Sequence, residues 1–103
     1  MIETSPGIRS QVVIVDPLGL HLRPAAKVAV LAKSFQSDIR VIAKATPADA
    51  KSIIELLILT IGCGTTLDIV AHGPDAEEAV AALTGLISGG LDGSVRRAAA
   101  AAA

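Results

Sequence analysis

A single histidine stands where a strand-to-helix turn would end, in the segment Gly19-Leu20-His21-Leu22-Arg23-Pro24-Ala25. The free amide groups and the positive dipole end of a helix that begins there favour a bound phosphate or another dianion. The same dipole disfavours a positive charge on the ring and leaves a neutral ring nitrogen available as a nucleophile. Arg23 can bring a planar guanidinium to an oxyanion on His21, and Gly19 removes a Cβ that would obstruct an approaching partner. These residue types in this order indicate reversible phosphorylation of a histidine, whereas a histidine that only caps a helix requires none of these neighbours.

The seven-residue segment closely resembles the active-site motif of the HPr family, the histidine-containing phosphocarriers of the bacterial phosphoenolpyruvate-dependent sugar phosphotransferase system. The likeness covers about residues 11–88. It implies that His21 accepts the phosphoryl group through Nδ1, that Arg23 steadies the phosphate, and that Pro24 shapes the first helical turn. It also implies enzyme I as the donor, enzyme IIA proteins as the acceptors, no cofactor, and a stoichiometric carrier rather than a turnover enzyme.

Two functions are open at this stage. The first is phosphoryl transfer for sugar uptake. The second is a regulatory HPr-like module, either in a nitrogen-related phosphotransferase branch or as a kinase-responsive corepressor. An intact His21 and Arg23 favour transfer over a purely regulatory protein, but they do not separate a sugar branch from a nitrogen branch.

A second segment, Ala50-Lys51-Ser52-Ile53-Ile54, is similar to the family segment whose serine is modified by HPr kinase/phosphorylase. The resemblance makes Ser52 a regulatory site and that kinase a further partner. Ser52 with Glu55 also has the form of a capping box, which accounts for the serine on structural grounds alone. The sequence therefore gives Ser52 a structural and a regulatory interpretation at once.

The helix expected after Ser52 carries more apolar residues than one core-facing stripe can use. An overpacked short helix is one explanation. The other is an exposed apolar surface next to His21, on which enzyme I and enzyme IIA dock. The resemblance assigns Ile53, Ile54 and Leu57 to that surface.

Hydropathy patterns predict the elements that must position these residues. Strands are expected at 11–16, 38–43 and 67–72, and helices at about 22–35 and about 53–59. A further helix is expected to begin at Asp75, which forms a second capping-box pattern with Glu78. The alternation of Leu67, Ile69 and Ala71 predicts a sheet with one buried face.

The segment between the second and third strands departs from the family pattern. Lys44-Ala45-Thr46-Pro47 stands where a glycine-containing turn is usual, and Pro47 restricts a third strand within 44–50 to an edge position. Helices that alternate with few strands predict an α+β open-faced β-sandwich. We expect a four-stranded antiparallel sheet with three helices on one face.

The composition sets the remaining expectations. With 103 residues, of which 51% are hydrophobic, the chain has material for one core, over residues 11–88. Residues 1–10 are expected to form a leader and residues 89–103 a flexible Gly/Ala-rich tail. A formal net charge of −1, one Phe and no Trp or Tyr argue against binding of nucleic acid. The most apolar run, 53–63, is too short to span a bilayer, and no signal peptide is readable. We therefore expect a cytoplasmic protein without membrane insertion.

No metal site or disulfide is expected. The single Cys63 cannot form an intramolecular disulfide, and only His21 and His72 accompany it, neither at ligand spacing. His72 is expected on the exposed face of the sheet.

Overall fold

A computed structural model describes residues 7–59 and 61–89 of the chain. The elements along this part of the chain are β1 (Ile8–Val13), α1 (Leu22–Lys33), β2 (Asp38–Ala43), β3 (Thr46–Asp49), α2 (Ile53–Ile58), β4 (Thr66–His72) and α3 (Ala76–Ser88). Across these two described ranges, no helix has the length and apolar character that crossing a membrane requires.

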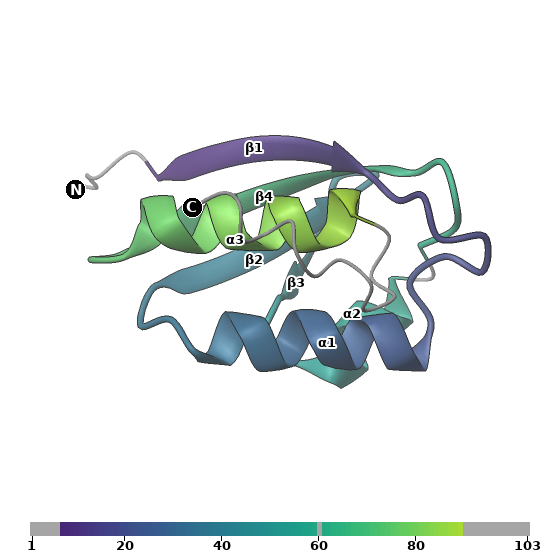
Figure 1. Ribbon diagram of the computed structural model, residues 1–103, viewed down its shortest axis with the longest axis horizontal. Helices are drawn as coiled ribbons and strands as arrows, with labels where there is room; N and C mark the ends of the chain where they lie inside the picture. The colour runs from purple at the N-terminus through teal and green to yellow at the C-terminus, as the bar shows by residue number, and fades with distance from the viewer. Residues whose placement is uncertain (1–6, 60, 90–103) are drawn as a thin grey trace.

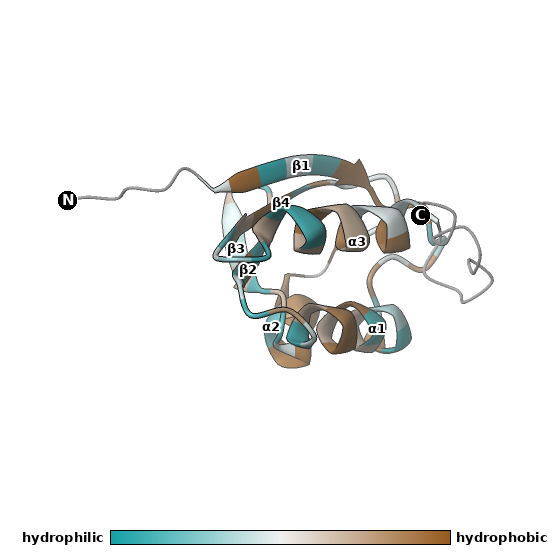
Figure 2. Ribbon diagram, turned by 60° about the vertical axis from the view of Figure 1, so that its left-hand side comes forward, coloured by the Kyte–Doolittle hydropathy of each residue, from teal (hydrophilic) through white to brown (hydrophobic). Residues whose placement is uncertain are grey.

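The four strands form one antiparallel sheet in the order β1-β4-β2-β3 (Figure 1). The three helices lie on one side of it, with α3 packed against β1 and β4, and α1 packed beside α2 (Figures 1 and 2). The predicted α+β open-faced β-sandwich is confirmed, including its three helices on one face. Residues 1–6 of the expected leader and residues 90–103 of the expected tail lie outside the described residues.

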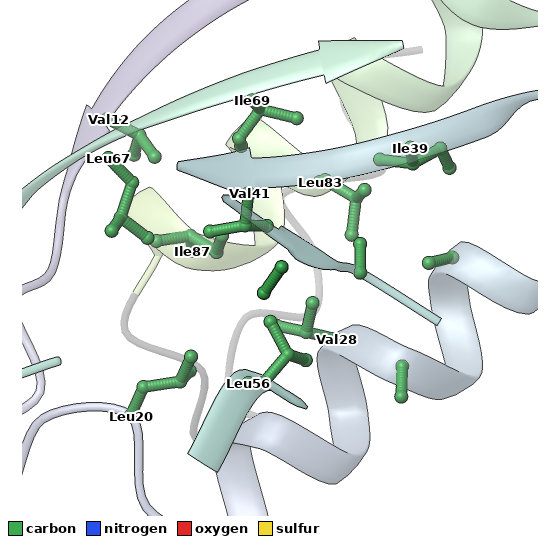
Figure 3. Close-up of a cluster of buried hydrophobic side chains, with 14 of the residues drawn as sticks. Val12, Leu20, Val28, Ile39, Val41, Leu56, Leu67, Ile69, Leu83 and Ile87 are labelled. Carbon is green, nitrogen blue, oxygen red and sulfur yellow. The ribbon is translucent and has the colours of Figure 1, made fainter. Parts of the chain in front are cut away.

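The core lies between the sheet and the helices. Leu67, Ile69 and Ala71 of β4 are fully buried, as their alternation predicts, while His72 at the end of that strand is exposed. Figure 3 shows the strand side chains meeting side chains from every helix: Val28 of α1, Leu56 of α2, and Leu83 and Ile87 of α3. The buried hydrophobic side chains of this core are all aliphatic, and Phe35, the single aromatic residue, packs against them while partly buried.

β1 begins and ends three residues earlier than the hydropathy pattern predicts. Residues 8–10, which the sequence placed in the leader, pair with residues 69–71 of β4. After Val13 the pairing continues only through Ile14, whose amide donates to the Thr65 carbonyl at 3.0 Å and whose carbonyl accepts the Gly64 amide at 2.8 Å. The β-branched run extends past Val13, but β4 has no residues left to pair with it. Strand length is therefore set by the partner strand and not by local propensity.

β3 forms as an edge strand, although its turn lacks glycine. Register pairs Ala43 with Thr46, so Lys44 and Ala45 alone make the turn, and their φ angles are 51° and 69°. Positive φ at both central residues matches the two-residue hairpin turns that suit the twist of a sheet. Pro47 lies opposite Ile42, in the next pair after the one that closes the turn, so an amide hydrogen there would point to the open edge.

Asp75 stands at the start of α3 but does not cap it with its side chain, which corrects the capping-box expectation. Its carboxylate reaches across to the segment before β2. It accepts hydrogen bonds from the backbone amides of Gln36 and Ser37, both at 2.9 Å, and from the Ser37 hydroxyl. The Ser37 hydroxyl bond and the Gln36 amide bond, in that order, lower the pKa of Asp75 from its ordinary 3.8. This carboxylate therefore joins two segments that are distant in the sequence.

Asp75 makes stability depend on acid pH. Because its pKa is lower in the folded chain, the unfolded chain takes up the proton first as the pH falls. The stabilisation is fully present above about pH 4 and is lost as the pH falls through the folded-state pKa. We expect denaturant titrations of the native chain and of Asp75→Asn to show a difference in unfolding free energy that narrows in this acid range. A difference that stays constant down to about pH 2 would contradict the assignment.

Replacing Ala45 with glycine should stabilise the chain. The left-handed conformation costs an alanine about 1–2 kcal/mol, which exceeds the conformational entropy that glycine adds to the unfolded chain. We expect an unfolding free energy higher by about 0.5–1 kcal/mol in denaturant titrations. Ala48→Gly is the matched control, because Ala48 is buried in β3 without a positive φ, and it should lower stability. A loss of stability in both variants would contradict the strained turn.

Candidate functional site

Two loops clamp the site together through backbone hydrogen bonds. The Leu20 amide donates to the Ile61 carbonyl at 2.9 Å, and the Gly64 amide donates to the Ile14 carbonyl at 2.8 Å. Leu20 itself is buried beneath the turn. The loop that precedes β4 thus fixes the loop between β1 and α1, and it does so at Leu20, one residue before the histidine.

Gly19 allows these loops to approach each other. Its φ is +74°, and a Cβ placed there would collide with the Ile61 carbonyl oxygen and lie 2.8 Å from the Gly62 Cα. The sequence attributed this glycine to the approach of a partner protein. In the structure the atoms that need the space belong to this chain itself.

His21 precedes the first turn of α1 and does not cap it with its ring. Its backbone is extended, with φ −88° and ψ −169°, and its carbonyl accepts the Ala25 amide at 2.9 Å. The side chain makes no capping hydrogen bond and is 40% exposed. Pro24, buried in the first turn, has no amide hydrogen, so the unsatisfied donors there are the amides of Leu22 and Arg23. The arrangement presents a ring nitrogen, two amides and a positive helix end to solvent.

Arg23 follows on the same turn with its side chain exposed. Within residues 7–59 and 61–89, its guanidinium makes no hydrogen bond or ion pair. A guanidinium without a partner can pair with an incoming oxyanion without first breaking a bond.

Sequence analysis missed Asp16, which lies opposite the histidine ring. Asp16 Oδ1 is 3.9 Å from His21 Nε2 and also accepts the Leu18 amide at 2.9 Å. The Asp16 side chain is only 16% exposed. An aspartate followed directly by a proline is typical of an Asx turn, in which the carboxylate accepts the backbone amide two residues further along the chain. This pattern could have indicated a fixed carboxylate at Asp16.

Ser52 caps α2, as the sequence predicts. Its Oγ accepts the Glu55 amide at 3.1 Å. The reciprocal bond of a capping box does not form, because the Glu55 carboxylate accepts the Asp49 amide at 2.9 Å. Next to the serine, Lys51 Nζ donates to the Phe35 carbonyl at 2.8 Å, just after the last turn of α1. Ser52 and His21 therefore lie near opposite ends of α1, whose 12 residues span about 18 Å.

The three residues expected to form a docking surface differ in exposure. Ile54 is 67% exposed, whereas Ile53 and Leu57 are partly buried and pack against the core. Ile58, one turn after Ile54, is 70% exposed, and Leu18 and Leu22 on either side of His21 are 75% and 63% exposed. Figure 2 shows α1 and α2 side by side below the sheet, with apolar residues on both.

The other candidate residues form no site in the described ranges. Across residues 7–59 and 61–89, no group of three or more His, Cys, Asp or Glu side chains could hold a metal ion. Cys63 is exposed in the loop before β4, and His72 is exposed at the end of that strand.

Comparisons with known proteins show which family the chain belongs to. Residues 8–89 match a family model described as PTS HPr component phosphorylation site. Phosphocarrier protein HPr of Vibrio cholerae is 44% identical over 77 residues, which are 75% of this chain and 91% of that protein. Phosphocarrier protein NPr of Shewanella violacea is 36% identical over 85 residues, which are 82% of this chain and 93% of that protein. The crystal structure of HPr-C-His from Thermoanaerobacter tengcongensis matches with a TM-score of 0.79 at 34% identity, covering 82% of this chain and 94% of that one. The chain belongs to the HPr family of phosphocarrier proteins.

Gly19→Ala should loosen the clamp on the site. The variant combines a left-handed backbone with a collision against the backbone of the facing loop, so we expect a loss of about 2 kcal/mol or more in unfolding free energy. Gly85→Ala in α3 is the matched control, because nothing lies within 4 Å of a Cβ there and alanine favours a helix. Denaturant titration of both variants measures the difference. Equal stability of Gly19→Ala and the native chain would contradict the close approach.

Proposed function

From this family membership and the open histidine at the start of α1, we propose that His21 takes a phosphoryl group from phospho-enzyme I and passes it to enzyme IIA components for sugar uptake. This proposal rests on one observation: the His21 ring lies at a helix N-terminus, is about half exposed, and makes no capping hydrogen bond. Phosphoryl transfer asks little of a protein beyond a positioned nucleophile and charge stabilisation. The chain is then a stoichiometric carrier in the cytoplasm, working without a cofactor.

Each neighbour of His21 has a distinct role in this proposal. Nε2 faces Asp16, which supports Nδ1 as the nitrogen that takes the phosphoryl group. The exposed Arg23 guanidinium steadies the phosphate oxygens, together with the free amides of the first turn. Pro24 sets the direction of that turn with its fixed φ and removes no bond that the helix would make.

The exposed apolar residues near the start of α1 and on α2 form the docking surface of this proposal. Of the three residues expected from the sequence, Ile54 is the one that is largely exposed. We add Ile58, Leu18 and Leu22 to this surface, because their exposed fractions are similar to that of Ile54. Ile53 and Leu57 contribute their remaining exposed atoms from the edge of the core. Enzyme I and enzyme IIA would bury these side chains in turn, each bringing its own reactive group to His21.

Phosphorylation of Ser52 by HPr kinase/phosphorylase would act on docking and not on the ring. A phosphate at the α2 N-terminus would be tolerated by the helix dipole. It would place about two negative charges one and two residues before Ile53 and Ile54, where an apolar partner surface is expected. Because His21 lies near the other end of α1, a direct effect on the ring is not required.

The alternative function is a regulatory branch, nitrogen-related or corepressor-like, built on the same fold. Similar proteins named HPr and NPr both match this chain over most of their length. His21 and Arg23 serve either branch. The acceptor protein decides between them, so transfer to enzyme IIA proteins of the two branches is the observation that separates these functions.

We expect the chain to gain an acid-labile phosphate when it is incubated with enzyme I, magnesium and phosphoenolpyruvate. Intact mass before and after mild acid measures this, because a phosphohistidine hydrolyses in acid whereas a phosphoserine does not. His21→Ala should take up no phosphate. Arg23→Ala should be phosphorylated more slowly, by about tenfold for the loss of one charge-assisted bond. His72→Ala is the matched control and should behave as the native chain, since His72 is exposed on the sheet. An acid-labile phosphate on His21→Ala would end the assignment.

A further inference from the structure

Asp16 is held in place independently of the histidine it faces. Its Oδ1 accepts the Leu18 amide at 2.9 Å, and its backbone carbonyl accepts the Gly19 amide at 2.8 Å. The side chain is 16% exposed, less than half the exposure of the His21 side chain. The position of this carboxylate is thus fixed by the turn before His21, and the ring meets a charge that is already in place.

The contact between Asp16 and His21 is electrostatic: the carboxylate attracts the positive end of an Nε2–H bond on the neutral ring and the full charge of a cationic ring. The distance of 3.9 Å from Oδ1 to Nε2 exceeds that of a hydrogen bond, but it lies within the range of an ion pair. Once the ring is a cation, two opposite charges this close in water attract each other enough to favour that cation about fivefold. The other charged residue at this turn, Arg23, has the opposite sign and is exposed. The carboxylate is therefore the group that favours a proton on the Nε2 side of the ring.

The side of the ring matters because a neutral imidazole carries one proton. A nucleophilic Nδ1 needs its lone pair, so the proton must be on Nε2. In the transfer step the Nδ1 lone pair forms a bond to phosphorus, and the bond from phosphorus to the donor breaks with its electron pair returning to the donor. No proton moves, Nε2 keeps its hydrogen, and the ring becomes a cation. A carboxylate near Nε2 favours both the tautomer that reacts and the charge that forms.

We propose that Asp16 is a positioning residue, which holds the proton of neutral His21 on Nε2 and stabilises the cationic ring formed when Nδ1 takes a phosphoryl group. This rests on the proposed function for its second half, whereas the tautomer is a property of the free protein. A merely structural role for Asp16, as the acceptor of the Leu18 amide, needs no charge.

Asp16→Asn separates the two roles. Asparagine keeps an oxygen for the Leu18 amide but removes the charge. Asp38→Asn is the matched control, because it removes the same charge from an exposed ion pair with Arg40 at the start of β2. The ratio of the Nε2–H to the Nδ1–H tautomer is read from ¹⁵N chemical shifts of the His21 ring, in alkaline solution where imidazole is neutral.

We expect the tautomer ratio to fall in Asp16→Asn by up to about fivefold, the limit that two full charges at this distance would set, and to stay unchanged in Asp38→Asn. The rate of phosphorylation by enzyme I should fall by a similar factor in Asp16→Asn alone, with an unchanged denaturation midpoint. Asp16→Ala should add a loss of stability, because the Leu18 amide loses its acceptor.

The outcomes are distinguishable. A tautomer ratio in Asp16→Asn equal to that of the native chain overturns the positioning role, even if phosphorylation of the native chain succeeds. A native ring that carries its proton mainly on Nδ1 overturns it as well. If the native chain takes no phosphate from active enzyme I, the proposed function fails and the transfer half of this inference fails with it. The tautomer ratio still decides the first half in that case.

Discussion

The site depends on a close contact between two loop backbones. The Leu20 amide reaches the Ile61 carbonyl only because Gly19 has no Cβ to hold the loops apart. This contact determines where the chain leaves the sheet and where α1 begins, and therefore where the His21 ring stands. The Asp16 carboxylate is fixed within the same turn. A reactive histidine on a short loop would otherwise sample many orientations, and the clamp removes that freedom without burying the ring.

Much of the fold could be predicted, and His21 could be proposed as the acceptor, because the signals for both are local. Alternation in 67–72 and the order of residues in 19–25 each occupy a few positions. The failures concern partners that are distant in the sequence. The end of β1 is set by β4, and the carboxylate of Asp75 binds Ser37 and Gln36 although its own helix offers free amides. No local pattern contains those partners. Asp16 was missed for a different reason, since a short β-branched run concealed a turn residue.

The helices α1 and α2 hold His21 and Ser52, the two residues proposed for phosphorylation, near opposite ends of α1. The N-terminus of α1 presents His21, and the segment after its C-terminus receives Lys51, the neighbour of Ser52. The exposed side chains of Ile54 and Ile58 share one side of α2 because they are four residues apart. In the proposed function, a phosphate on Ser52 would thus affect the docking surface without rearranging the His21 ring. Neither of these two proposed roles requires a change in the fold.

The exposure of the ring also bears on how long a phosphoryl group would persist on it. In the proposed function, a phosphoryl group on the His21 side chain, which is 40% exposed, would stand in water, and water is itself a nucleophile. A site that is open to a partner's reactive group is also open to water, which would hydrolyse the phosphohistidine. The phosphorylated chain would therefore have a limited lifetime. Delivery then depends on how soon an acceptor is met, which makes the concentrations of carrier and acceptor part of the yield. A deeper pocket would lengthen that lifetime, but it would also exclude the acceptor.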